Sequence, residues 1–274
     1  MLNELETLRD AQLELIEALR HIHEICQLNN IQFWIDSGTL LGAKRNGKFI
    51  PWDEDIDICM TRDNYDKFLE IANIYLDKEK YFLQTTKTDQ YYDYQPVPCK
   101  LRLNNTCIDW TDQNGKLFNY NKKAHSGLYI DIFPLDHAPQ KSTQRRIINT
   151  LYRLYYLNRF NDLKKIKKIA RKTFNLFFNR KFIDNLNKKY FEKENKKNTE
   201  YLDYSLDMGL KSYNFPKKII FPLSQITFEN ITLPCPKDVN NYLIILYGEN
   251  YLIPPSNPYQ HGIIRYISEK KYRE

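Results

Sequence analysis

The residues with the clearest chemical potential lie between positions 53 and 57, where four of the five side chains are carboxylates. If this run is a strand, Asp53, Asp55 and Asp57 project from one face of it. Three like charges on one face repel one another, and a buried carboxylate without a partner is costly. A divalent cation relieves both problems, and ligands that are all oxygen suit Mg²⁺ or Mn²⁺. The run therefore predicts a metal site for phosphate chemistry.

A further carboxylate, Asp131, lies inside the apolar segment 127–136. An isolated carboxylate among apolar strand residues is expensive unless it is paired, protonated or bound to a metal. A hydrogen bond to the backbone or to a neighbouring arginine is the alternative explanation, but the acidic run upstream favours a shared metal. Asp131 would then be a metal ligand or the group that takes the acceptor's proton, and the sequence leaves both roles open.

Gly38 and Thr39 follow a short apolar segment, residues 31–36, that is expected to be a strand. Glycine and hydroxyl residues directly after a strand let backbone N–H groups approach a phosphate closely. Lys44 and Arg45 come shortly afterwards and are candidates for neutralising phosphate charge, with solvated loop charge as an equal alternative. A phosphate-binding turn is therefore expected between the first strand and the acidic run.

Two more cations alternate with leucines in the segment 97–103. Because successive side chains of a strand point to opposite faces, Lys100 and Arg102 fall on the same face. They are candidate contacts for an anionic ligand, although a polar sheet face in water explains the same pattern.

The elements expected to position these residues include both helices and strands, as in an α+β protein. Apolar residues at helical spacing predict an amphipathic helix over residues 3–28. A hairpin is expected over 226–233, turning at Glu229-Asn230. Further helices are expected at 61–76 and at 236–248, where Gly248 ends the helix, and strands at 81–87, 97–103 and 106–110.

Residues 141–200 are expected to be a basic helical region. They contain 18 Lys and Arg against 5 Asp and Glu, whereas the whole chain has a net charge of +7, so the remainder is acidic. This segregation favours an anionic partner such as a phosphorylated glycan, an anionic lipid or nucleic acid. A solvated basic face explains it equally well.

Composition limits the class of protein. A chain of 274 residues with 42% hydrophobic and 27% charged residues fits one large or two small folded domains. The acidic N-terminus lacks a signal-peptide pattern, and no run is long enough to span a bilayer. Five cysteines without a CxxC pair fit a reduced, cytoplasmic setting. The basic region still allows peripheral contact with an anionic membrane at the inner face of the cell membrane.

Four stretches together resemble the LicD family of phosphocholine transferases, relatives of the fukutin-type ribitol-phosphate transferases. They run in family order from residue 38 to residue 261 and comprise GTLLGAKRNGKFIPWDEDIDICMTRDNYDKF, CKLRLNNT, GLYIDIFPLD and a C-terminal series that starts at FPL. The resemblance implies a nucleotidyltransferase-like α+β fold, with a mixed sheet core, flanking helices and a basic helical insert. It implies a catalytic core with an N-terminal helix at 1–140, the basic helical region at 141–215 and a C-terminal part at 216–274 that completes the core.

The resemblance also assigns roles to single residues. Gly38 and Thr39 match the phosphate-binding turn of the family. Asp55 and Asp57 match its acidic pair on the following strand, and Asp131 supplies the third carboxylate.

Three other positions are less firmly assigned. Asp53 is a further metal ligand or a group behind the ligands. Glu54 stands where the family often has Asp, but it is expected on the strand face turned away from the metal. His261 ends the last matching stretch and is a candidate substrate contact.

The resemblance implies a Mg²⁺- or Mn²⁺-dependent transferase in the synthesis of cell-surface polysaccharide, such as lipopolysaccharide, capsule or teichoic acid. A hydroxyl of the glycan or teichoic-acid acceptor would attack the β-phosphate of a CDP-linked donor, CDP-choline first among them, and CMP would leave. The residues by themselves indicate only metal-dependent phosphoryl transfer.

Three other functions fit parts of the sequence. A nucleotide-sugar glycosyltransferase would use an Asp-x-Asp motif, but such enzymes place a sizeable nucleotide-binding region before it, and here one helix and one strand precede Asp53. A catalytically silent protein of the same fold would bind anionic polymer through residues 141–200. A nucleic-acid enzyme of the same fold is the least favoured of the three.

Overall fold

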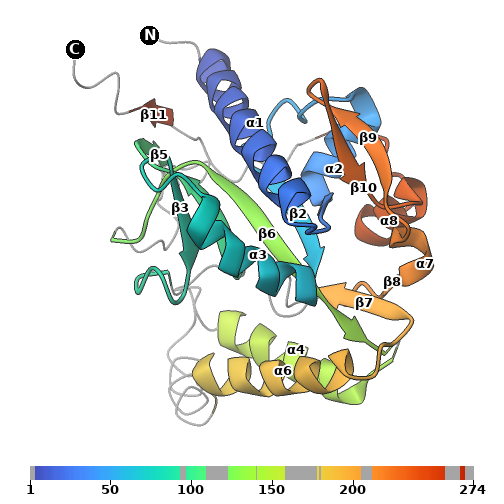
Figure 1. Ribbon diagram of the computed structural model, residues 1–274. Coiled ribbons are helices and arrows are strands. Elements are labelled where there is room, and N and C mark those ends of the chain that lie inside the picture. The colour runs from blue at the N-terminus through green and yellow to red at the C-terminus, as the bar shows by residue number, and fades with distance from the viewer. Residues whose placement is uncertain are drawn as a thin grey trace. The chain divides into compact units, whose positions relative to one another are not determined.

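The computed structural model describes residues 4–92, 97–108, 123–139, 141–157, 178, 180–204, 212–256 and 266–268. The chain forms two compact units, residues 1–134 with 219–274 and residues 135–218. The sequence suggests boundaries at 140 and 215. Figure 1 labels the helices and strands of both units.

A mixed β-sheet is the frame of the first unit. Its strands are β1 (Trp34–Ile35), β2 (Ile56–Thr61), β3 (Tyr81–Thr85), β4 (Cys99–Leu103) and β6 (Tyr129–Ala138), in the spatial order β1-β2-β6-β4-β3. β1 pairs antiparallel with β2, and β4 pairs antiparallel with both β3 and β6. β2 and β6 are neighbours at the centre of the sheet and run in the same direction (Figure 1). The predicted α+β fold with a mixed sheet is confirmed.

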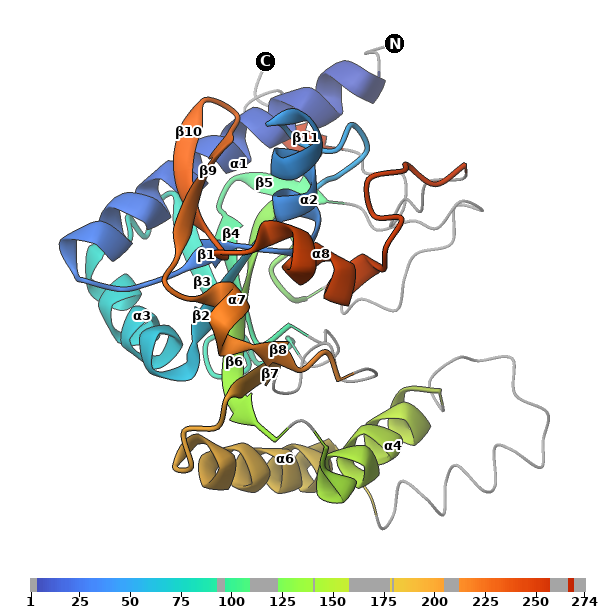
Figure 2. The same ribbon diagram turned by 90° about the vertical axis from the view of Figure 1, so that its right-hand side faces the viewer.

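Helices lie on both sides of this sheet. α1 (Glu4–Leu28) and α3 (Arg62–Tyr75) cover one face, and α2 (Ser37–Asn46) and α8 (Val239–Tyr247) lie on the other side, as Figures 1 and 2 show together. Apolar side chains spaced about one helical turn apart along α1 and α3 are buried in the core. The two helices that the sequence predicts for this part of the chain are confirmed.

The predicted C-terminal hairpin is also confirmed. β9 (Ser224–Phe228) pairs antiparallel with β10 (Ile231–Cys235). Glu229 and Asn230 between them both have positive φ, as a tight hairpin turn requires. The Glu229 carboxylate accepts two hydrogen bonds of 2.8 Å from the guanidinium of Arg9 in α1, so the turn is tied to the N-terminal helix.

α8 forms where the sequence predicts a capped helix. Asp238 precedes it, and the Asp238 side chain accepts a hydrogen bond from the N–H of Asn241. The helix ends at Gly248. Two short strands, β5 (Thr106–Ile108) and β11 (Tyr266–Ser268), pair antiparallel with each other. This pairing places residues 266–268 beside a strand from the middle of the chain.

The second unit contains the basic region. Its elements are α4 (Thr143–Leu157), α6 (Arg180–Asn195), β7 (Tyr201–Tyr204), β8 (Phe215–Pro216) and the start of α7 (Lys217–Ile220), and the last residues of β6 pair with β7. Most of the segment between α4 and α6, which the sequence predicts to be helical, lies outside the described residues. Among the helices that the structure describes, none is both long and apolar enough to cross a membrane.

Asp136 differs from the expectation that it caps a helix after Pro134. β6 continues to Ala138 and carries Asp136 in its interior, where the carboxylate is buried. Its Oδ1 accepts a 2.6 Å hydrogen bond from Asn195 Nδ2 in α6. The cap prediction was wrong because Pro134 lies between the residues that pair with β4 and those that pair with β7, where a missing N–H does not interrupt the strand.

Candidate metal and phosphate site

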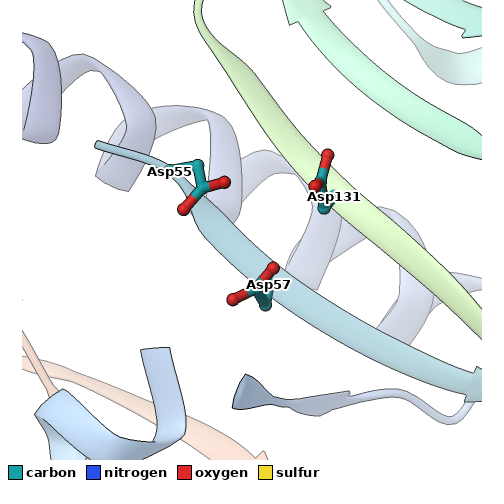
Figure 3. Close-up of side chains that lie close together, drawn as sticks. All are labelled: Asp55, Asp57 and Asp131. Atoms are coloured by element: carbon teal, nitrogen blue, oxygen red, sulfur yellow. The ribbon is translucent and has the colours of Figure 1, made fainter. Parts of the chain in front are cut away.

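Three carboxylates converge at the centre of the first unit's sheet. Asp55 immediately precedes β2, Asp57 is the second residue of β2, and Asp131 lies in neighbouring β6. One oxygen of each carboxylate lies within 4.8 Å of one oxygen of the other two. Figure 3 shows the three side chains projecting into the same space beside the two strands. The structure thus brings together three of the four residues that the sequence analysis assigns to a metal, and leaves Asp53 outside the group.

The negative charge of this cluster is poorly compensated. Burial raises the pKa of Asp57 well above its usual range, and the charges of Asp55 and Asp131 raise it further. Burial also raises the pKa of Asp131 to about 6, although Lys100 opposes the shift. A divalent cation held by the three carboxylates would remove this penalty, and a donor set made only of oxygen fits Mg²⁺ or Mn²⁺.

Lys100 belongs to this cluster as the cation beside Asp131, and its predicted contact with the donor stays a prediction. It lies directly opposite Asp131 in the β4–β6 pair, and its ammonium donates a hydrogen bond to Asp131 Oδ1. The ammonium also lies 3.7 Å from the centre of the Tyr129 ring, and only 2% of the residue is exposed. The alternation of residues along a strand predicts the sheet face on which a lysine lies, but it does not predict whether other segments bury that face. The structure therefore makes Lys100 a buried partner that orients Asp131.

Arg102 is fully buried on the same face of β4. Its Nε donates a 2.7 Å hydrogen bond to Gln84 Oε1, and its Nη1 donates a 2.7 Å hydrogen bond to the carbonyl oxygen of Gly127. The guanidinium carbon lies 4.7 Å from the centre of the Tyr129 ring. Arg102 therefore holds neighbouring segments of the sheet together, and the donor contact that the sequence predicts for it stays a prediction.

The predicted turn at Gly38 and Thr39 is the first turn of α2. The Gly38 N–H donates a 3.2 Å hydrogen bond to Asp57 Oδ2, and Thr39 Oγ1 accepts a 2.9 Å hydrogen bond from the Asp57 N–H. A Cβ atom at Gly38 would come within 2.6 Å of Asp53 Oδ2, so a larger residue here would displace the Asp53 side chain. A helix N-terminus attracts anions, and that of α2 adjoins the carboxylate cluster, so phosphate binding by this turn stays a prediction.

Asp53 and Glu54 lie before the strand rather than on it. β2 begins at Ile56, so Asp53, like Asp55, precedes the strand. Asp53 is outside the group of three carboxylates, although its charge raises the pKa of Asp57. Its carboxylate lies against Gly38, and its role toward a metal stays a prediction. Glu54 is 3% exposed, and burial together with the charges of Asp55 and Asp53 raises its pKa to about 9.

Lys44 and Arg45 lie in the last turn of α2. At the rise of an α-helix they are about 10 Å along the axis from Gly38. Lys44 is exposed. Arg45 Nη2 donates hydrogen bonds to the carbonyl oxygens of Tyr251 and, at 3.3 Å, of Ile253, so Arg45 holds the loop after α8. Phosphate binding by either cation stays a prediction.

The sequence analysis missed two residues and left one role undefined. Asp36 is fully buried, and its Oδ1 accepts a 2.8 Å hydrogen bond from the hydroxyl of Tyr242, 206 positions away, a pairing that leaves no local pattern. Ser37 has a φ of 44°, and its buried hydroxyl has no hydrogen-bond partner within the described part of the chain. His261 lies outside the described residues.

Comparison with known proteins connects this geometry to a family. The family model that describes the nucleotidyltransferase domain of LicD, FKTN and FKRP matches residues 30–160 and 156–238.

Individual relatives match shorter stretches. The chain is 32% identical over 135 residues to the lipopolysaccharide cholinephosphotransferase LicD of Haemophilus influenzae, a stretch that covers 49% of this chain and 46% of the relative. It is 30% identical over 128 residues to an uncharacterized protein of Rickettsia prowazekii, covering 47% and 41%. It is 39% identical over 42 residues to the ribitol 5-phosphate transferase FKRP of Homo sapiens, covering 15% and 8%. The chain therefore spans less than half the length of each of these relatives.

Proposed function

The chain belongs to the LicD family, and on that premise we propose that it is a metal-dependent phosphotransferase. Its donor is a CDP-linked phospho-alcohol, CDP-choline in the first instance. Its acceptor is a hydroxyl of a cell-surface glycan or teichoic acid, and CMP is released. The observation that carries the proposal is the convergence of Asp55, Asp57 and Asp131 beside the N-terminus of α2. The names of the Haemophilus and human relatives support phosphocholine or ribitol phosphate as the transferred group.

In this proposal Asp55, Asp57 and Asp131 hold Mg²⁺ or Mn²⁺, which would supply positive charge against the phosphate oxygens of the donor. The N-terminus of α2 and the unpartnered Ser37 hydroxyl bind phosphate oxygens. Lys100 opposes protonation of Asp131, which favours the role of a ligand over that of a base for this carboxylate.

The reaction balances as a phosphoryl transfer. The acceptor oxygen forms a bond to the β-phosphorus of the donor, and the bond from that phosphorus to the oxygen of CMP breaks. CMP leaves with the electron pair, and the hydroxyl proton passes to a base or to water. The product is a phosphodiester on the acceptor.

We also propose a cytoplasmic protein that meets its acceptor at the inner face of the cell membrane. The surplus of positive charge between residues 141 and 200 supports this placement, because anionic lipid attracts basic segments.

A nucleotide-release assay tests the proposal. The protein is offered CDP-choline, CDP-ethanolamine, CDP-glycerol, CDP-ribitol and UDP-sugars, each with Mg²⁺ or with chelator and with candidate acceptor glycans. The Asp55→Asn, Asp57→Asn double variant is compared with Asp10→Asn, Asp63→Asn, which removes two exposed carboxylates.

CMP release that needs metal, persists in the control and disappears in the site variant supports the proposal and names the donor. Release of UDP would favour a glycosyltransferase. If no nucleotide is released with any donor and acceptor, a protein that binds anionic polymer without catalysis is favoured.

A further inference from the structure

Asp57 is held at three points by the segment at the start of α2. The Asp36 N–H donates a 2.9 Å hydrogen bond to the Asp57 carbonyl oxygen. The hydroxyl of Thr39 accepts from the Asp57 N–H, and the N–H of Gly38 donates to the Asp57 carboxylate. The position of this carboxylate therefore depends on the position of residues 36–39.

That segment is not stabilised in the way helix starts usually are. Asp36 occupies the N-cap position of α2, but its side chain makes no capping hydrogen bond to the helix. The next residue, Ser37, has a φ of 44°, which is unfavourable for a residue with a Cβ. A contact from elsewhere in the fold must hold this conformation.

One such contact comes from α8. The Tyr242 hydroxyl donates a 2.8 Å hydrogen bond to Asp36 Oδ1, and it accepts one of 3.3 Å from the indole N–H of Trp34 in β1. All three side chains are fully buried. A hydrogen bond to a buried carboxylate in such surroundings is among the stronger ones in a protein.

We infer that Tyr242 and Asp36 are positioning residues for the metal and phosphate site. Tyr242 holds the Asp36 carboxylate in place of a local cap, and the backbone of residues 36–39 in turn fixes the Asp57 carboxylate and the helix N-terminus beside it. The inference concerns the site of the proposed transferase, but metal binding can be measured without turnover.

The sharpest test compares Tyr242→Phe with Tyr251→Phe. Both variants remove one hydrogen-bonded tyrosine hydroxyl from the C-terminal part of the first unit. In the control, the Tyr251 hydroxyl donates a 2.9 Å hydrogen bond to Asn240 Oδ1. Tyr251 lies in the loop after α8 and is not connected to Asp36 by any hydrogen bond that the structure describes. Phenylalanine keeps the ring in both cases, so both variants should fold, and Tyr242→Phe should lower the Tm more because it removes hydrogen bonds to two fully buried groups.

Two readouts separate positioning from general stability. For Tyr242→Phe we expect Mn²⁺ affinity, measured by titration of the metal-free protein, to fall about fivefold, because the loss of one hydrogen bond to a charged group is only partly felt at the metal. We also expect faster amide hydrogen exchange in residues 36–40. Tyr251→Phe should change neither.

Unchanged Mn²⁺ affinity in Tyr242→Phe, or an equal loss in both variants, would overturn the inference. So would a wild-type protein that binds no Mn²⁺. A wild-type protein that binds Mn²⁺ but releases no nucleotide from any donor would refute the proposed transferase and leave this comparison of the two variants fully informative.

Discussion

β6 carries two buried aspartates in opposite surroundings. Asp131, in the first unit, faces the negative charges of Asp55 and Asp57, and Lys100 is its hydrogen-bonded cation. Asp136, in the second unit, accepts a hydrogen bond from the neutral side chain of Asn195. The same strand thus places one carboxylate among like charges and the other beside a fixed donor.

The residues around Asp136 make hydrogen bonds within their own unit. Asp203, opposite it on β7, accepts a 3.1 Å hydrogen bond from the N–H of Tyr213, and the charge of Arg145 opposes the effect of burial on the Asp203 pKa. Arg145 in turn donates to the carbonyl oxygen of Tyr204. Burial of a carboxylate therefore does not mark a functional site. Convergence of like charges does, because such an arrangement lowers stability and is explained by a ligand.

The largest expected effect comes from Asp57→Asn. Removal of one of three converging carboxylates should lower metal-dependent CMP release on the order of a thousandfold. The same change should leave the metal-free protein as stable as the wild type or raise its Tm by about 2–4 °C, because it removes a carboxylate that lies close to those of Asp55 and Asp131. Thermal unfolding in chelator and the release assay check the two parts. A fall in Tm would show that the carboxylate is a structural group like Asp136.

Lys100→Met should have the next largest effect. Without its cation, Asp131 has a pKa above the present value of about 6, so the acid limb of the pH–rate profile moves to higher pH. We expect about a tenfold loss of activity at pH 7. Lys87→Met, which removes an exposed lysine, is the control and should leave the profile unchanged. An unshifted profile in Lys100→Met would mean that Asp131 does not need to be charged for catalysis.

Asp136→Ala should reverse the pattern of Asp57→Asn. It leaves Asn195 without its buried acceptor, at a cost of about 1–3 kcal/mol in the free energy of unfolding. Activity per folded molecule should stay within about twofold. Denaturant unfolding and the release assay, run on the same preparation, test this. If the fully folded variant loses much of its activity, the second unit has a direct catalytic role.

The smallest effect concerns pH and the stability of the metal-free protein. A carboxyl whose pKa is higher in the folded protein than in the unfolded chain favours folding at low pH, and this advantage is lost as the pH rises through the folded value. For Glu54 that window extends from its usual pKa of 4.5 to about 9. The Tm in chelator should therefore fall across this range, and Glu54→Gln should flatten the slope. If Tm depends on pH with the same slope in the wild type and in Glu54→Gln, Glu54 does not keep its proton in the folded protein.

Much of the framework could be predicted from local patterns. The long N-terminal helix, the hairpin at Glu229-Asn230 and the helix that ends at Gly248 follow from apolar spacing and turn residues, which act over a few positions. The grouping of Asp55, Asp57 and Asp131 follows from the cost of carboxylates on apolar strands.

The remaining features depend on contacts that no local pattern encodes. Lys100 and Arg102 have the alternation of a solvated strand, yet the structure buries them because other segments cover that face. Asp53 is not part of β2 because the strand begins at Ile56, whereas the acidic run suggests a strand that begins at Asp53. Asp36 meets Tyr242 only because α8 folds back onto the first strands.

The contacts between the two ends of the first unit also bear on when the site forms. The hydrogen bonds from Tyr242 to Asp36 and from Arg9 to Glu229 span 206 and 220 positions. During synthesis the acidic strand leaves the ribosome long before α8 exists, and contacts of such length form late. We expect a nascent chain that ends before α8 to hold Mn²⁺ weakly. Tight ion binding would then indicate that the polypeptide has been synthesised and folded as far as α8.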